Sequence, residues 1–470
     1  NISIHGSGGG GIGDRNRGVG IWTGATVSTG SGALEVTGVG GGSGASEDNI
    51  GIQIQDAVVS TTSGPLRLSG TGGLTTGKWN RGIGVFNGAT VTSATGDISV
   101  NGHGGGSGSS TNNYGVQVSS NSVVGTTSTG DVSIIGEGAS SDGNSNIGVV
   151  VEGSDGRVET SLGNINIQGT GGKGTGSNNR GIAVWNSGVI SSGNGNLTLS
   201  GRGSESEGMY NHGIHTTGEN SRILTVDGDL TAVGYGGGSG LDSDGNHGIV
   251  MTNESQIAST GLGNISFESH GGTSLGGYNV GLVIRTDASV TSNEGSIDIT
   301  SFAGTGTSGH GIAIADIDGG LIASAKNDIN ILTDAFGINP AGSITSGNNS
   351  SISIAPLTQH SRVLLGDDTS RQGAWLQLSD SELDQFNTPN LTIGNSTSGE
   401  IIVANNIIRA QATNVSLISA ESVVTAGGSI DTGGGTLSLS SGNYGSLEPL
   451  SSGTDFTAST TTFSSESRYQ

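Results

Sequence analysis

The chain has 470 residues, of which 92 are glycine and none is cysteine, and its 39 acidic and 16 basic residues give a formal charge of −23 at pH 7. So much glycine disfavours helices, the lack of cysteine removes disulfides and thiolate metal sites, and the negative charge repels nucleic acid and anionic membranes. No stretch approaches the ~20 apolar residues that span a bilayer. Asn1 opens directly inside a strand pattern, so we expect the sequence to be a segment of a longer chain.

Up to about residue 328 the sequence repeats with a period of about 33 residues, over about ten units. Each unit opens with two apolar residues separated by a polar one, the pattern of a half-buried strand. A glycine-rich loop follows, then a second apolar pair, then a weaker third strand. The opening pairs are Ile2/Ile4, Leu34/Val36, Leu66/Leu68, Ile98/Val100, Val132/Ile134, Ile165/Ile167, Leu197/Leu199, Leu230/Ala232, Ile265/Phe267 and Ile297/Ile299.

Three strands per unit predict an all-β fold, a right-handed parallel β-helix (β-solenoid) with three strands per coil. Each unit exposes an apolar edge that it cannot bury alone, and stacking at ~4.8 Å places equivalent residues above one another in one core. Each buried Val or Ile contributes roughly 1.5–3 kcal/mol, which offsets much of the cost of ordering a coil. We expect about ten such coils with glycine-rich side loops in 1–328.

Two polar columns recur in the same register. The first stands two residues before a glycine, and we interpret it as a ladder of asparagines that tolerate a left-handed corner and hydrogen-bond along the axis. Its members are Asn16, Asn49, Asn80, Asn113, Asn146, Asn179, Asn211, Asn246 and Asn279, with Gly309 in the tenth unit. The second precedes the first strand and mixes acids with amides, which limits repulsion between rungs. Its members are Asp97, Asp131, Asn164, Asn196, Asp229, Asn264 and Asp328.

Aromatic and histidine side chains stand beside these columns. Trp22, Phe86 and Trp185 follow the second inward pair and should point outward. Our preferred interpretation is that they cover the glycine loops of adjacent coils; the alternative is that they contact sugars or a neighbouring protein. His212, His247 and His310 directly follow the ladder position, where we expect solvent-facing corner residues in preference to a transition-metal pair.

The pattern changes after residue 328. The unit shortens and the long glycine loops disappear, so we expect a second segment, 329–470, that continues the solenoid with narrower coils. Within it, Ser379 and Glu382 form an S-x-x-E capping box, which predicts a small helical insertion near residues 379–386.

Both segments of the sequence resemble a known protein family. The run LQLSDSELD, followed by LTIGNSTSGEIIV, is similar to a recurrent element of filamentous-haemagglutinin-like and autotransporter-type bacterial adhesins, and the glycine-rich units resemble their stalk repeats. The resemblance covers nearly the whole chain. It implies a β-solenoid, secretion to the bacterial cell surface, and a role in adhesion or biofilm structure.

The sequence offers no convincing site for catalysis or a cofactor, so we assign no catalytic, cofactor-binding or metal-binding residue. Asp242, Asp244 and Asn246 match the D-x-D-x-N opening of a calcium loop. His247 stands where that loop needs glycine, and Asn253 where it needs the bidentate glutamate. Acid–glycine turns are the better explanation, and structural calcium is kept only as an alternative.

The leading hypothesis is a non-catalytic extracellular stalk or filament segment of a bacterial surface protein. A carbohydrate-active β-helix, such as a polysaccharide lyase or depolymerase, is the alternative from a different class. Self-association into filaments and binding of surface glycans or proteins are the partnerships we consider, because unpaired strand edges promote assembly. We expect neither nucleic acid nor a membrane span in this segment.

Overall fold

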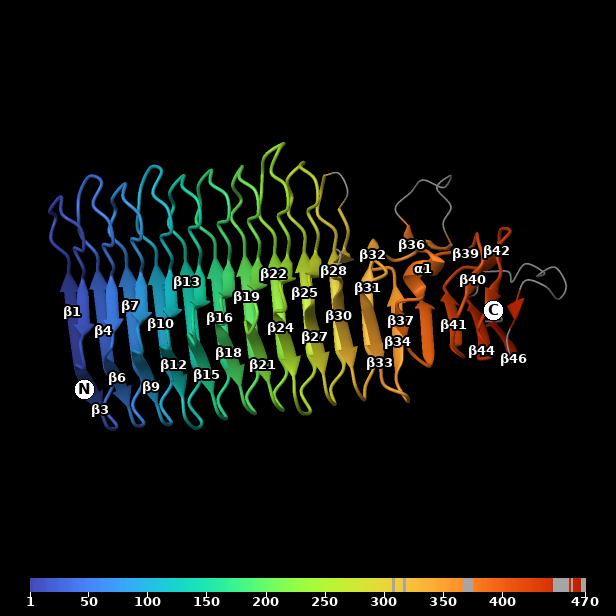
Figure 1. The fold of residues 1–470 in the computed structure, drawn as a ribbon, viewed down its shortest axis with the longest axis horizontal. Helices are drawn as coiled ribbons and strands as arrows, with labels where there is room; N and C mark the ends of the chain where they lie inside the picture. Colours follow the sequence, from blue (N-terminus) through green and yellow to red (C-terminus); the bar gives the residue numbers. More distant parts are fainter. Residues whose placement is uncertain (307–308, 316–317, 367–374, 443–455, 458–459, 466–470) are drawn as a thin grey trace, which may run out of the picture.

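The computed structural model describes residues 1–306, 309–315, 318–366, 375–442, 456–457 and 460–465. The chain winds as a long solenoid in which each of the first eleven coils contributes one strand to each of three parallel sheets (Figure 1). The predicted three-stranded coils and their parallel stacking are confirmed. We number the coils by their first strand, with β1 (Ile2–Ser7) opening coil 1 and β28 (Ile297–Phe302) opening coil 10.

The first sheet runs through the whole described length of the chain, with 16 strands. After β1 its members are β4 (Leu34–Val39), β7 (Leu66–Thr71), β10 (Ile98–His103), β13 (Val132–Glu137), β16 (Ile165–Thr170), β19 (Leu197–Arg202), β22 (Leu230–Tyr235), β25 (Ile265–His270), β28, β31 (Ile329–Thr333), β34 (Ser351–Ala355), β38 (Asn390–Gly394), β41 (Asn414–Ser419), β44 (Thr436–Ser441) and β46 (Thr460–Ser465).

The second sheet follows the side loops of the coils. Its members are β2 (Val19–Trp22), β5 (Ile52–Gln55), β8 (Ile83–Phe86), β11 (Val116–Ser119), β14 (Val149–Glu152), β17 (Ile182–Trp185), β20 (Ile214–Thr217), β23 (Ile249–Thr252), β26 (Leu282–Arg285), β29 (Ile312–Ala315) and β32 (Phe336–Ile338).

The third sheet closes each coil. Its members are β3 (Thr26–Thr29), β6 (Val58–Thr61), β9 (Thr90–Ser93), β12 (Val123–Thr126), β15 (Arg157–Thr160), β18 (Val189–Ser192), β21 (Arg222–Thr225), β24 (Gln256–Ser259), β27 (Ala288–Ser292), β30 (Gly320–Ser324), β33 (Ser343–Ser346) and β37 (Phe386–Asn387).

Equivalent residues meet rung by rung along the axis. Ile83 pairs with Val116, and Val116 pairs with Val149, as the repeat alignment requires. The inward aliphatic residues of all three sheets form one buried cluster that extends from Val19 to Leu439. Alternation therefore sets the strand faces, and the repeat period sets the register between coils.

Each of the first ten coils carries a side arm between its strands in the first and second sheets, and the arms stand in a row along one side of the solenoid (Figure 1). Backbone hydrogen bonds join successive arms, as from Gly41 N–H to the Asn16 carbonyl (2.7 Å) and from Gly42 N–H to the Gly9 carbonyl (2.7 Å). The arms are therefore regular extensions of the coil and not loose loops.

In coils 1–8 the arm leaves the coil through a narrow neck of two facing glycines. A Cβ on Gly102 would lie 2.2 Å from the Gly115 carbonyl oxygen, and a Cβ on Gly115 would lie 2.4 Å from the Glu137 nitrogen. The obstructing atoms are backbone, so they cannot swing away. In coils 9 and 10 serines replace the first glycine, and Ser301 Oγ donates to the Gly311 carbonyl (2.6 Å).

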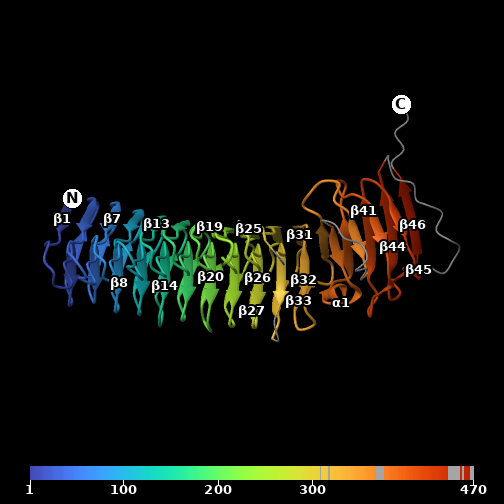
Figure 2. The ribbon, with the colours of Figure 1, turned by 90° about the horizontal axis from the view of Figure 1, so that it is seen from above.

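The coils narrow from β31 onward. Residues paired in the first sheet are 22–24 positions apart in most of these coils, where the first ten coils have 32–35. The exception is the coil with the helical insertion, in which Ser351 pairs with Asn390, 39 positions later. The second sheet ends at β32 (Figure 2), and two small sheets take its place (Figure 1). They comprise β35 (Val363–Leu365), β36 (Leu376–Leu378), β39 (Ile401–Val403) and β42 (Val423–Thr425), and β40 (Ile407–Ile408), β43 (Ile430–Asp431) and β45 (Phe456–Thr457). Residues 466–470, which end the expected segment 329–470, lie outside the described residues.

The helical insertion is present as α1 (Asp380–Leu383), shorter than the predicted span. Ser379 caps it, with the reciprocal Ser379–Glu382 contacts of a capping box. The sequence pattern did not reveal its other end, where the buried Arg409 donates to the Leu383 and Phe386 carbonyls. An arginine from the following coil thus holds the carbonyl end of the helix.

We expect the loss of stability on replacing a glycine to depend strongly on whether that glycine lies in the neck of an arm. We expect Gly115→Ala to lower stability by about 1–3 kcal/mol or more, because its methyl group meets only backbone. Gly13→Ala is the matched control, since a Cβ there meets nothing within 4 Å. Urea midpoints and protease cleavage within the arms provide the measurement, and equal behaviour of the two variants would contradict the neck.

Candidate functional site

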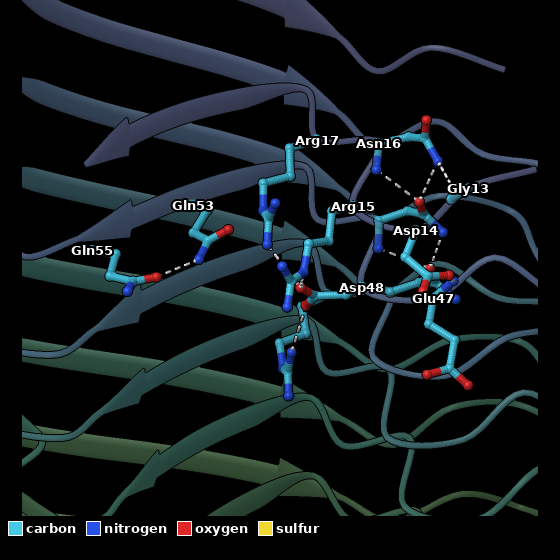
Figure 3. A network of polar contacts seen from close by, with 12 residues as sticks. Gly13, Asp14, Arg15, Asn16, Arg17, Glu47, Asp48, Gln53 and Gln55 are labelled. Atoms are coloured by element: carbon cyan, nitrogen blue, oxygen red, sulfur yellow. Dashed lines mark hydrogen bonds and ion pairs between the residues drawn. The ribbon is translucent and has the colours of Figure 1, made fainter. Parts of the chain in front are cut away.

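The asparagine ladder ties each side arm to the next. The backbone N–H of each ladder residue donates to Oδ1 of the equivalent Asn in the following coil, at 2.7–3.2 Å. The Nδ2 group donates to the residue three positions earlier, which fixes the turn of the arm. From Asn49 to Asn279 the ladder residues are fully buried. Figure 3 shows the first rung, with Asn16 bonded to Gly13.

The left-handed corner lies one residue before the ladder, so placing it on the asparagine itself was wrong. Positive φ angles of 57–67° occur at the preceding residue in coils 1–7 and in coil 9, where the residue is never glycine. These residues are Arg15, Asp48, Trp79, Asn112, Ser145, Asn178, Tyr210 and Tyr278. This conformation costs roughly 1–2 kcal/mol for an ordinary residue. The corner turns the next side chain, the asparagine, inward to reach its neighbour.

Breaking one rung should therefore be costly. Asn113→Ala removes the acceptor of the buried Asn80 N–H and the donor to Asn146. An unsatisfied buried polar group costs about 1–3 kcal/mol. We expect faster hydrogen exchange and easier proteolysis in the arms of coils 3–5. The control is Asn101→Ala, an exposed asparagine on the outer face of β10. Equal exchange in both variants would show that the ladder does not hold the arms.

The second polar column also forms a ladder, but its hydrogen bonds run in the opposite direction along the chain. Here the side chain of one coil accepts the backbone N–H of the next, as from Asp131 to Asp97 Oδ1 (3.0 Å) and from Asn164 to Asp131 Oδ1 (2.7 Å). The contacts continue through Asn196, Asp229, Asn264 and Ser296, and Asp328 accepts from Ser351. Ser296, Asp328 and Ser351 are half-buried, and the other members are exposed, which lets water screen their stacked carboxylates.

The three aromatic residues lie flat on the outer face of the second sheet. A Cβ on Gly20 would touch the Trp22 ring, and a Cβ on Gly84 would touch the Phe86 ring, so each ring covers the glycine two residues before it. Trp185 packs in the same way over a cluster that contains Ala183. They therefore cover small residues of their own strands, where we predicted cover for the glycine loops of adjacent coils. Trp22 remains 46% exposed; a contact with sugars or proteins stays a prediction.

An arginine accompanies each of these aromatics. Arg17, Arg81 and Arg180 follow the ladder asparagine in coils 1, 3 and 6, and each guanidinium carbon lies 5.5–5.6 Å from the centre of its ring. In coils 1–3, Arg15, Arg17 and Arg81 share the single carboxylate of Asp48. Figure 3 shows Arg15 and Arg17 beside it. Burial lowers the pKa of Arg180 to about 10. The sequence signature is Asn-Arg-Gly-aliphatic-small-aliphatic-aromatic.

The histidines of this column are buried, so the expected solvent-facing corner was wrong for two of them. His212 and His247 are 5% and 8% exposed, and their rings stack with centres 5.1 Å apart. His310 is half-buried. His212 Nδ1 accepts the His247 N–H (3.3 Å), and His247 Nδ1 accepts the Val280 N–H (3.1 Å). With Nδ1 accepting, a neutral ring carries its proton on Nε2, so neither nitrogen offers a metal a free lone pair.

Burial is also the main cause of the perturbed titration here. It holds the pKa of His212 and of His215 well below the ordinary value and lowers the pKa of His247 to about 3. The positive charges of Arg180 and Arg285 add to the effect. These imidazoles therefore stay neutral when the coils are folded.

We expect acid to destabilise the coils that contain His212, His215 and His247. The unfolded chain takes up protons below about pH 6.5 while the folded coils resist them, so stability is lost as the pH falls from there toward 3. A variant with His212→Ile, His215→Val and His247→Ile uses residues found at equivalent positions in other coils. Compared with the wild type, we expect it to lose less stability between pH 7 and 4, by up to about 3 kcal/mol per histidine. Urea unfolding at both pH values measures the difference, and the exposed His5→Ile is the control. A wild-type-like pH profile would contradict the prediction.

The residues of the calcium-like stretch serve the coil packing. Asn246 is a ladder member whose Oδ1 accepts the Asn211 N–H (2.9 Å), and Asp244 Oδ1 accepts the Gly277 N–H (2.6 Å). Within the described ranges, no group of three His, Cys, Asp or Glu side chains is placed to hold a metal ion. Calcium at this stretch therefore stays an untested alternative.

The sequence analysis missed a third polar column. A buried Thr or Ser ends strands of the third sheet and donates to a glycine carbonyl three or four residues later. Examples are Thr61 to Gly64 (2.7 Å), Thr126 to Gly130 (2.6 Å) and Thr160 to Gly163 (2.6 Å). The signal was present as a hydroxyl residue three or four positions before the closing glycine of these coils.

Comparison with known proteins identifies no relative: no family model, no curated protein and no solved structure matches the chain. Among the described residues, no helix is long and apolar enough to cross a membrane. The structure places the protein in the class of parallel β-solenoids, here with regular side arms.

Proposed function

We propose that the chain is an extracellular, non-catalytic stalk or filament segment of a bacterial surface protein, which keeps its length and presents a surface. The observation that supports this best is the single apolar cluster, from Val19 to Leu439, with a first sheet that spans the same coils. A body held by one axial core and a continuous hydrogen-bond ladder resists bending and extension along its length.

The winding also suits folding outside the cell. Each coil pairs with its immediate neighbours, so the solenoid can grow coil by coil from one end as the chain emerges. A chain without cysteine needs no oxidant to reach this fold. The resemblance of LQLSDSELD and LTIGNSTSGEIIV to elements of filamentous-haemagglutinin-like adhesins supports the same location.

The groups whose pKa values are strongly shifted favour a structural role over the carbohydrate-active alternative. His212 and His247 use Nδ1 to bind the backbone of the next coil. Burial raises the pKa of Tyr114 to about 12, and its hydroxyl contacts Asn112. The histidines are committed to contacts between coils and Tyr114 to a contact within its own coil, whereas acid–base catalysis needs a group free to exchange protons with a substrate.

Surface location gives the first test. We expect protease treatment of intact cells of the producing organism to remove the segment, without release of cytoplasmic contents, and to weaken cell attachment. Lysed cells are the control for cleavability. Protection in intact cells and cleavage only after lysis would refute the extracellular role.

Two further measurements separate the alternatives. Electron microscopy of the purified segment should show dispersed straight rods, whereas bundles or long fibres would indicate filament assembly. Incubation with acidic and neutral polysaccharides should release no oligosaccharides, and sustained turnover would overturn the non-catalytic assignment.

A further inference from the structure

A polar groove of about 690 Å³ runs along the outside of the solenoid where the side arms of coils 5–7 leave the first sheet. Its walls come from the ends of β13, β16 and β19 and from the first residues of the three arms that follow. The lining side chains with polar or charged groups include Glu137, Ser140, Lys173, Arg202, Ser204 and Glu205. Thr170 and four glycines complete the lining.

The charges in the groove balance, although the chain as a whole is strongly acidic. Two carboxylates face two cations, and Arg202 forms an ion pair with Glu205. Lys173 forms no ion pair within the part of the chain that the structure describes, and its side chain is exposed. The Ser204 hydroxyl is buried and has no hydrogen-bond partner among the described residues. The groove thus offers donors and acceptors without net charge.

The floor of the groove is rigid. Gly138, Gly171 and Gly203 pack directly against the carbonyls of the ladder asparagines of their own coils, where an added Cβ would lie 2.0–2.1 Å from the oxygen. The ladder therefore fixes the groove before any ligand arrives. A preformed site spends little binding energy on ordering loops.

Beyond Arg202 the wall continues as a column of stacked rings. The Arg202 guanidinium lies over Tyr235 (5.8 Å to the ring centre), Tyr235 stacks on His270 (4.5 Å), and His270 stacks on Phe302 (4.1 Å). These side chains occupy one register position in coils 7–10. They extend the wall parallel to the solenoid axis.

From these features we propose that the groove binds a neutral, linear polysaccharide, which lies along the solenoid axis over coils 5–8. Sugar hydroxyls match the mixed donors and acceptors of the lining, and over coils 5–7 no aliphatic or aromatic side chain lines the groove to favour a lipid or an apolar peptide. A polyanion would meet balanced charges in the groove and long-range repulsion from the rest of the chain. Such a polysaccharide is the partner of the surface role proposed above, and the biological relevance of the groove rests on that proposal.

Affinity gel electrophoresis of the purified segment provides the test. The neutral probes are galactomannan, a mixed-linkage β-glucan and dextran; alginate and dextran sulfate are the charged probes. We expect at least one neutral probe to retard the wild type and neither charged probe to do so. The double variant Lys173→Ala/Arg202→Ala should bind at least tenfold more weakly. The matched control is Arg222→Ala/Lys326→Ala, which removes the same charges from exposed positions outside the groove and should bind like the wild type.

Three outcomes would overturn the inference: no retardation by any neutral probe, retardation by charged probes alone, or equal binding by the groove variant and the wild type. Circular dichroism and electron microscopy establish that each variant still forms a rod, so a loss of binding is not confused with misfolding. None of these outcomes touches the stalk proposal. Protection from protease in intact cells would refute that proposal and leave groove binding standing.

Discussion

The side arms depend on one buried hydrogen bond, from the backbone N–H of each ladder asparagine to the carboxamide oxygen of the next coil. Burying the backbone of a glycine-rich arm is costly unless its polar groups find partners, and the asparagine supplies them. Its side chain satisfies the returning strand, while its carbonyl accepts from the outgoing arm of the neighbouring coil. The ladder ends at Asn279 in coil 9, where Nδ2 of Asn279 still donates to the Thr305 carbonyl in the arm of coil 10. Coil 10 carries the last arm, and coil 11 passes from Thr333 to Phe336 without one.

This constraint explains the residues around the ladder. The left-handed residue before it aims the carboxamide inward, and the paired glycines of the neck let outgoing and returning backbones approach closely. The residue after it points to the outer face of the second sheet, where neighbouring coils bury it. Arginine over an aromatic ring, an aliphatic residue such as Ile50 or Ile147, and stacked histidines are alternative ways to fill the same position.

The sequence predicted those features of the fold that recur in every repeat. Apolar alternation identified the inward residues, and the period set the register, because stacking in a solenoid places equivalent residues next to each other. The burial of His212 depends instead on the size of the residues one coil away, which a single unit does not show. Ile50 in the same column was a sign that this position is covered. The capping box predicted the start of α1, but Arg409, which closes its end, comes from a later coil.

The ladder also links stability to surface chemistry. Because the glycine carbonyls and amides of the arms are bonded from coil to coil, the arms can carry many different side chains without losing their backbone positions. Glu137, Thr170, Arg202 and Tyr235 occupy one register position on successive coils, so chemistry changes along the axis while geometry does not. A solenoid of this kind varies its surface one coil at a time, and each variation stays confined to that coil and its two neighbours.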